Sequence, residues 1–92
     1  MLEDFRLRVF MAVAQEGSFT KAAASLGVTQ PAVSQNIAEL EKITGVRLFE
    51  RLRGETVLTA EGRVFGDYAR RLLATCASAE NMFAKLSAAN VR

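Results

Sequence analysis

The side chains best suited to recognise another molecule lie in one short stretch, residues 30–35. The amides of Gln30 and Gln35 can donate and accept hydrogen bonds in pairs, which is the pattern that adenine N6 and N7 present in the major groove of DNA. Ser34 can bond a base or a phosphate, and small residues such as Pro31 let a helix approach closely. We therefore expect these four residues to read base edges: Gln30, Pro31, Ser34 and Gln35.

Cations that could hold phosphates follow this stretch in the chain. The formal net charge is only +2, but residues 46–71 contain six arginines against four acidic residues. We expect Arg51 and Arg53, supported by Arg47 and Lys42, to provide most of the attraction to phosphate. Arg51 could instead pair with the glutamate at position 50 or 55, so both interpretations stay open for it. The hydroxyl residues expected at the sugar-phosphate backbone are Ser18, Thr20 and Thr29.

Catalytic, cofactor and metal chemistry is not indicated by the remaining side chains. The chain has no histidine and a single cysteine, Cys76, so common zinc-ligand sets and nucleophile–base pairs cannot be assembled. Its carboxylates are scattered, and no glycine-rich phosphate loop occurs. We expect a protein that is not an enzyme and that needs no cofactor and no metal.

The sequence also limits where the protein is expected to act. No stretch is both long and uncharged enough to span a membrane, so we expect no membrane partner. Glu3 and Asp4 stand where a secretory signal would carry basic residues. We therefore expect a cytoplasmic protein that is associated with the nucleoid.

Two helices that end at glycines are expected before residues 30–35. Apolar residues recur at spacings of three and four in the first segment, which is typical of one side of a helix. These residues are Leu7, Phe10, Val13 and Ala14, flanked by Phe5 and Met11. Gly17 should end this helix. Ser18 is a good N-cap for a second helix, rich in alanine, that Gly27 should end.

A tight turn at Gly27 is expected to join the second helix to a third helix over about 30–44. Gly27 accepts a positive φ at no steric cost, and Ala23 is small enough to let the two helices approach. The inner side of the third helix should consist of Val33, Ile37 and Leu40. A plain helical hairpin would show the same pattern, but the outer side is polar, small and nearly uncharged. That composition favours a helix-turn-helix that reads DNA.

A small hairpin and a long helix are expected after Gly45. Two β-prone runs, which begin at Val46 and at Thr56, surround a glycine turn and predict a hairpin over about 47–58. Thr59 can cap the helix that follows. This helix carries an apolar heptad stripe, typical of a coiled-coil seam. The expected dimer interface is Phe65, Ala69, Leu72, Cys76, Ala79, Phe83 and Leu86. The first part of this stripe could pack on the domain's own core, whereas the later part has nothing left to cover. The pattern does not tell whether the two paired helices run parallel or antiparallel.

Taken together, these segments resemble the DNA-binding domain of LysR-type transcriptional regulators. The similar segments are 17–23, 28–34, 45–51 and 58–62, together with Ile37, Leu40 and Glu41, and the resemblance covers residues 5–62. It implies a mainly α fold: a three-helix winged helix-turn-helix with a short β-hairpin wing over residues 1–59, then a long linker and dimerisation helix over 60–92. It also favours antiparallel pairing of that helix.

The same resemblance implies a sequence-specific transcription factor that binds an imperfect inverted repeat of double-stranded DNA as a homodimer, or as a tetramer in a full-length context. Family members are about three times longer because a ligand-sensing domain follows the linker helix. That effector-binding domain is absent before Arg92, so a small-molecule effector is expected only if such a domain exists elsewhere. Many members carry arginine at the place of Gln35 and at the wing tip, so phosphate attraction should be weaker here. The alternative is a helical, dimeric protein-interaction module without DNA binding.

Overall fold

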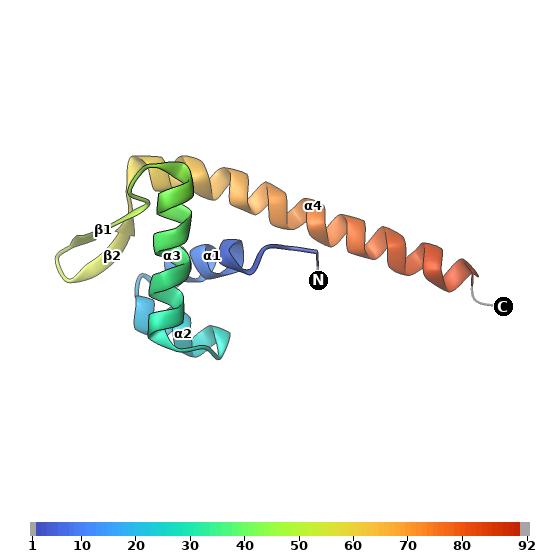
Figure 1. Cartoon of the computed structure of the whole chain (residues 1–92), viewed down its shortest axis with the longest axis horizontal. Coiled ribbons are helices and arrows are strands. Elements are labelled where there is room, and N and C mark those ends of the chain that lie inside the picture. The colour runs from blue at the N-terminus through green and yellow to red at the C-terminus, as the bar shows by residue number, and fades with distance from the viewer. Residues whose placement is uncertain (1, 91–92) are drawn as a thin grey trace.

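Residues 2–90 of the computed structural model form a helical body with a two-stranded hairpin and one long helix (Figure 1). The elements are α1 (Phe5–Glu16), α2 (Phe19–Leu26), α3 (Gln30–Thr44), β1 (Phe49–Leu52), β2 (Glu55–Leu58) and α4 (Ala60–Asn90). The predicted winged helix-turn-helix followed by a long helix is confirmed. Met1 and the predicted end of the long helix, residues 91–92, lie outside the described residues.

The turn between α2 and α3 has the predicted geometry. Gly27 adopts a left-handed conformation with φ 70°, and Val28 N–H donates to Ala23 O at 3.0 Å. Such a turn favours glycine because a side chain at this φ is strained. Thr29 then caps α3, its Oγ1 accepting a hydrogen bond from Ala32 N at 3.2 Å. The two helices are therefore fixed at a short connection, and α3 is turned so that Val33 is buried.

One hydrophobic core lies between the three short helices, the base of the hairpin and the first half of α4. Phe10 is at its centre, with its ring centroid 5.1 Å from that of Phe49 and 4.8 Å from that of Phe65. The fully or almost fully buried apolar residues are Val9, Phe10, Val13, Ala22, Ala23, Val33, Ile37, Leu40, Leu48, Phe49 and Ala69. The predicted inner side of α3 is confirmed.

The predicted inner side of α1 needs a correction. Val9 is completely buried but was left out of that side, whereas the flanking Phe5 is exposed. The reason is that α1 packs against α2, α3 and α4 at once, so its buried stripe is wider than the spacing of three and four indicated.

The hairpin pairs Phe49 with Leu58 and Leu52 with Glu55, in antiparallel register. Its turn residues have φ 53° at Arg53 and φ 79° at Gly54, the combination of a two-residue type I′ turn. The first strand begins at Phe49 instead of the predicted Val46. The backbone groups of Leu48 form other hydrogen bonds, because Leu48 N donates to the Glu41 carboxylate at 2.7 Å and Leu48 O accepts from Thr59 N at 3.0 Å.

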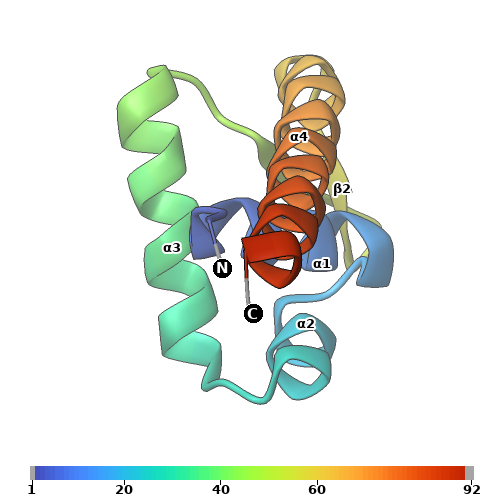
Figure 2. The same cartoon turned by 90° about the vertical axis from the view of Figure 1, so that its right-hand side faces the viewer.

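The start of α4 is capped as predicted by Thr59, whose Oγ1 accepts from Gly62 N at 2.9 Å and donates to Arg47 O at 2.7 Å. The first half of α4 packs on α1, and the carboxyl-terminal turns of the helix extend beyond the domain (Figure 1). In the view along α4, α3 stands upright beside it, with α2 at the lower end of α3 (Figure 2). Within residues 2–90, no helix combines the length and apolar character needed to cross a membrane.

The first part of the predicted apolar stripe on α4 packs on the domain's own core, which is the alternative that the sequence left open for it. Ala69 has no exposed surface within the single chain, and Phe65 is partly buried against Phe10, so both belong to the domain's own core. The exposed apolar residues on α4 are instead Val64, Tyr68, Leu72, Met82, Phe83 and Leu86. Cys76 and Ala79, which lie between Leu72 and Met82 along the helix, are half-buried.

Candidate nucleic-acid interface

The amino-terminal half of α3 turns four predicted base-reading residues to solvent. Gln30, Pro31, Ser34 and Gln35 are all exposed. The opposite side of the helix is buried, so α3 is held by its apolar stripe while its polar side stays free. Ala38 and Lys42 continue the exposed side toward the carboxyl end.

A groove of ≈ 320 Å³ lies between α3 and the first strand of the wing. Gln30 and Ser34 line it from α3, and Arg47 and Arg51 line it from the connection and from β1. Two predicted base readers and two predicted phosphate binders are thus brought together, although they are far apart in the sequence. Pro31, Gln35 and Lys42 lie outside this groove, on the outer side of α3.

The wing presents its arginines to solvent. Arg51 and Arg53 are exposed, and neither forms an ion pair with any residue in the described part of the chain. The pairing of Arg51 with a neighbouring glutamate, left open from the sequence, does not occur there. Arg53 occupies a left-handed position that normally favours glycine or asparagine, at some cost in strain. A charged side chain is therefore held at the tip of the wing.

Glu41 is a positioning residue that the sequence reasoning did not assign. Its carboxylate accepts from Leu48 N at 2.7 Å and lies 3.9 Å from Arg47 Nε, so it ties the base of the wing to α3. Arg47 Nη2 also donates to Phe49 O at 3.5 Å, yet the Arg47 side chain remains 78% exposed. The only sequence signal was that Glu41 follows Leu40 in a segment similar to the LysR type.

The predicted hydroxyl contacts sit at helix starts. The Oγ atoms of Ser18 and Thr29 accept hydrogen bonds from Lys21 N and Ala32 N, so each hydroxyl keeps its proton free to donate. Thr20 is exposed in the first turn of α2. Helix amino termini carry partial positive charge and unpaired N–H groups, which suits a phosphate oxygen. None of these three residues lines the groove between α3 and the wing.

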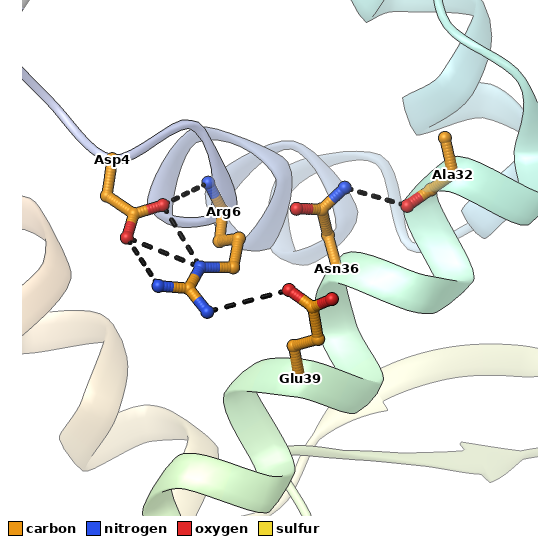
Figure 3. Close-up of polar contacts among 5 residues, drawn as sticks. All are labelled: Asp4, Arg6, Ala32, Asn36 and Glu39. Carbon is orange, nitrogen blue, oxygen red and sulfur yellow. Dashed lines mark hydrogen bonds and ion pairs between the residues drawn. The ribbon is translucent and has the colours of Figure 1, made fainter.

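The other side of α3 contacts the start of α1 through polar side chains (Figure 3). Arg6 Nη1 lies 3.5 Å from Glu39 Oε1, and Arg6 Nη2 lies 2.7 Å from Asp4 Oδ2. Asn36 Nδ2 donates to Ala32 O at 2.8 Å on the same side of the helix. None of these residues was given a structural role in the predictions from the sequence.

An exposed polar helix after a tight turn, with a groove to a wing that carries exposed arginines, defines a winged helix-turn-helix protein of the DNA-binding class. A sequence profile described as "Bacterial regulatory helix-turn-helix protein, lysR family" matches residues 5–63. The chain belongs to this family.

Similar proteins agree with this assignment. The chain is 49% identical over 71 residues to a "Probable RuBisCO transcriptional regulator" of Cyanidioschyzon merolae, covering 77% of this chain and 23% of that protein. It is 41% identical over 75 residues to "HTH-type transcriptional regulator CfxR" of Cupriavidus necator, covering 82% of this chain and 24% of that one. The chain thus spans about a quarter of the length of these curated relatives.

Solved structures of DNA-binding domains superpose over nearly the whole chain. The BenM domain in complex with catB site 1 DNA gives a TM-score of 0.86 at 38% identity, covering 94% of this chain and 97% of that one. The CbnR domain in complex with DNA gives a TM-score of 0.85 at 34% identity, covering 94% and 99% of the two chains.

Proposed function

We propose that this chain binds double-stranded DNA sequence-specifically and thereby regulates transcription. The observation that carries the proposal is the exposed amino-terminal half of α3 beside a groove that also holds two arginines. In this proposal Gln30, Pro31, Ser34 and Gln35 read base edges in the major groove. Further support comes from the similar domains of BenM and CbnR, which were solved in complex with DNA.

The phosphate contacts follow from exposure and charge. Arg51 and Arg53 would reach the backbone or the minor groove from the wing, and Arg47 and Lys42 would add charge beside α3. The hydroxyl donors are Ser18, Thr20 and Thr29. Because few cations are present, the affinity should depend only moderately on salt.

Residues 1–59 would form the DNA-binding unit, and 60–92 the helix that pairs two copies. The proposed seam on α4 is Val64, Tyr68, Leu72, Cys76, Ala79, Met82, Phe83 and Leu86. Leaving this many apolar side chains in water would be costly, since burying one such side chain fully is worth about 1.5 to 3 kcal/mol. Two copies related by a two-fold axis suit an imperfect inverted repeat.

An apolar pocket at the start of α4 favours the antiparallel direction for this pairing. The pocket has a volume of ≈ 290 Å³ and is lined by Thr44, Val46, Leu48, Glu61, Val64, Phe65 and Tyr68. In an antiparallel pair centred near Cys76, the far end of the second copy's α4, which carries Phe83 and Leu86, would reach this pocket. Both apolar surfaces would then be removed from water.

We further propose that the protein acts in the cytoplasm, at the nucleoid. A tetramer and a small-molecule effector belong to this proposal only where a sensing domain accompanies the domain described here. The curated relatives are about four times as long as the part that matches, which leaves room for such a domain in them.

The test is selection of the purified protein on random duplexes at about 150 mM salt, where phosphate-only binding is weak. We expect an interrupted inverted repeat. Gln30→Ala and Gln35→Ala should each weaken binding to the selected site by about 1 to 3 kcal/mol and hardly affect random DNA. Gln15→Ala, an exposed glutamine on α1, is the matched control and should change neither.

Failure of a folded, dimeric protein to enrich any sequence would favour the protein-interaction module. Equal losses on selected and random DNA in the glutamine variants would move these residues from base reading to backbone contact.

A further inference from the structure

The first turn of α1 carries two arginines that reach in different directions. Arg6 and Arg8 are two residues apart, which places them about 200° apart around the helix. Each pairs with acidic residues, and the two sets involve different helices.

Arg6 links α1 to α3. Its guanidinium lies between two carboxylates, with Nη2 2.7 Å from Asp4 Oδ2 and Nη1 3.5 Å from Glu39 Oε1 (Figure 3). Asp4 also caps α1 by accepting a hydrogen bond from Arg6 N at 2.9 Å. Glu39 is on α3, the proposed recognition helix, about two and a half turns after Gln30 at its start. The amino terminus of α1 is therefore in contact with the middle of α3.

Arg8 belongs to a second cluster that reaches α4. Arg8 Nε and Nη2 lie 2.7 and 3.1 Å from the two carboxylate oxygens of Glu3, whose side chain is only 6% exposed. The backbone N–H of Leu2 donates to Glu80 Oε2 at 2.6 Å. The Glu3 carboxylate raises the pKa of Arg8, and the charge of Glu80 adds to this effect. Glu80 thus ties α4 to the chain segment that Arg8 holds.

We propose that these two clusters, Arg6 with Asp4 and Glu39, and Arg8 with Glu3 and Glu80, set the angle between the recognition helix and α4 and so select the half-site spacing of the operator. This proposal rests on the proposed function, because it concerns a dimer that reads two half-sites. Arg6 and Arg8 are positioning residues in it and touch no DNA.

The contact at Glu80 lies beyond the buried half of α4, so a small rotation of the helix moves it by several ångströms. Ala69 is the last fully buried apolar residue on α4, and residues 81–89 are all exposed. Residue 80 lies 11 residues beyond Ala69, a distance of about 16 Å along a helix. A rotation of roughly 10° about the buried half would move residue 80 by roughly 3 Å, close to the 3.4 Å rise of one base pair. Loss of the contact at Glu80 would therefore widen the range of half-site spacings that the dimer accepts by about one base pair.

The pairs of Arg6 are partly exposed, and exposed ion pairs contribute little to stability, so a positioning role of Arg6 or Glu80 can be separated from a purely structural one. Arg8→Gln leaves the almost buried Glu3 carboxylate without its partner, so this variant should also be less stable. The variants are Arg8→Gln, Glu80→Ala and Arg6→Gln. Glu80→Ala removes only the contact on α4, in a largely exposed part of the helix, and keeps the test available if a change in α1 impairs folding. The control is Asp67→Asn, which removes an ion pair of 2.6 Å with Arg70 inside α4 that joins no other element.

The first measurement is the affinity for the selected half-sites separated by spacers that differ by one base pair. The wild type and Asp67→Asn should prefer one spacing by about tenfold or more. The three variants should lose at least threefold of this preference, and Arg6→Gln and Glu80→Ala should do so with nearly unchanged melting temperature. A preference as sharp as that of the wild type in all three variants would overturn the proposal.

The second measurement needs no DNA. Spin labels at Ala38→Cys, in a Cys76→Ala background, report the distance between the two recognition helices of a dimer. The distribution should broaden in Arg8→Gln and Glu80→Ala and stay narrow in Asp67→Asn. Unchanged distance distributions in the variants would overturn the proposal. If the distributions broaden as expected but the protein binds no inverted repeat, the result would count against the proposed function alone.

Discussion

Gly62 is the position at which adding one methyl group should be most damaging. A Cβ atom there would lie well inside contact distance of the Leu48 carbonyl oxygen, 3.0 Å from the Leu48 carbonyl carbon and 3.1 Å from Leu58 Cδ2. The carbonyl group cannot move freely, because it accepts the hydrogen bond from Thr59 N at 3.0 Å. Gly62 therefore allows the first turn of α4 to approach the base of the wing.

The effect of Gly62→Ala can be estimated from three opposing contributions. Alanine stabilises a helix by about 0.5 to 1 kcal/mol relative to glycine. Overpacking costs about 1 to 3 kcal/mol, and a weakened hydrogen bond at Thr59 costs about 1 kcal/mol more. The net result is a destabilisation of about 2 kcal/mol, which lowers the melting temperature of a domain of this size by roughly 8 to 16 °C.

Gly66→Ala is the matched control, one turn further along the same helix. A Cβ atom there would meet Phe10 Cε2 at 3.5 Å, an ordinary van der Waals contact. Only the gain in helix propensity remains, so this variant should be as stable as the wild type or more stable by up to about 1 kcal/mol.

The assay is thermal unfolding followed by circular dichroism, with all proteins at the same concentration because dimer formation raises the melting temperature. A Gly62→Ala protein that melts at or above the wild-type temperature, or one that melts together with Gly66→Ala, would refute the reasoning from close backbone approach.

Three further predictions concern the seam, the wing and the amino terminus. In a Cys76→Ala background, chains with Val64→Cys should form disulfides with chains that carry Leu86→Cys and not among themselves; the opposite pattern on denaturing gels would mean parallel helices. Arg51→Gln and Arg53→Gln should each lower the slope of log affinity against log salt by about 1, measured by fluorescence anisotropy; an unchanged slope would remove that residue from phosphate contact. The pKa values of Asp4 and Glu3 are lowered mainly by hydrogen bonds from Arg6 and Arg8, so their ionised forms stabilise the fold at neutral pH, and this contribution is lost as the pH falls below about 4. Asp4→Asn keeps the capping oxygen, so it should lose less stability than the wild type in acid denaturation; identical acid profiles would contradict this.

Much of the fold could be predicted because its signals are local. Helix ends depend on a residue and its immediate neighbours, as at Gly27 and Thr29, and the turn at Gly54 depends on a single left-handed pair. The exposed side of α3 followed from its period alone, since Val33 and Ile37 had to face inward.

The sequence by itself determined the positions of the helices, the hairpin and the turn, and it located the polar side of α3, because capping, turn conformation and helical period act within a few residues. Tertiary structure decided which part of the α4 stripe is buried within the domain itself: Ala69 is buried, while Tyr68 next to it is exposed. A heptad pattern does not distinguish a stripe that packs on the domain's own core from one that packs on a second helix. Tertiary structure also decided the roles of Glu41, Arg6 and Arg8, since a charged residue gains a positioning role only when folding brings a distant partner within reach.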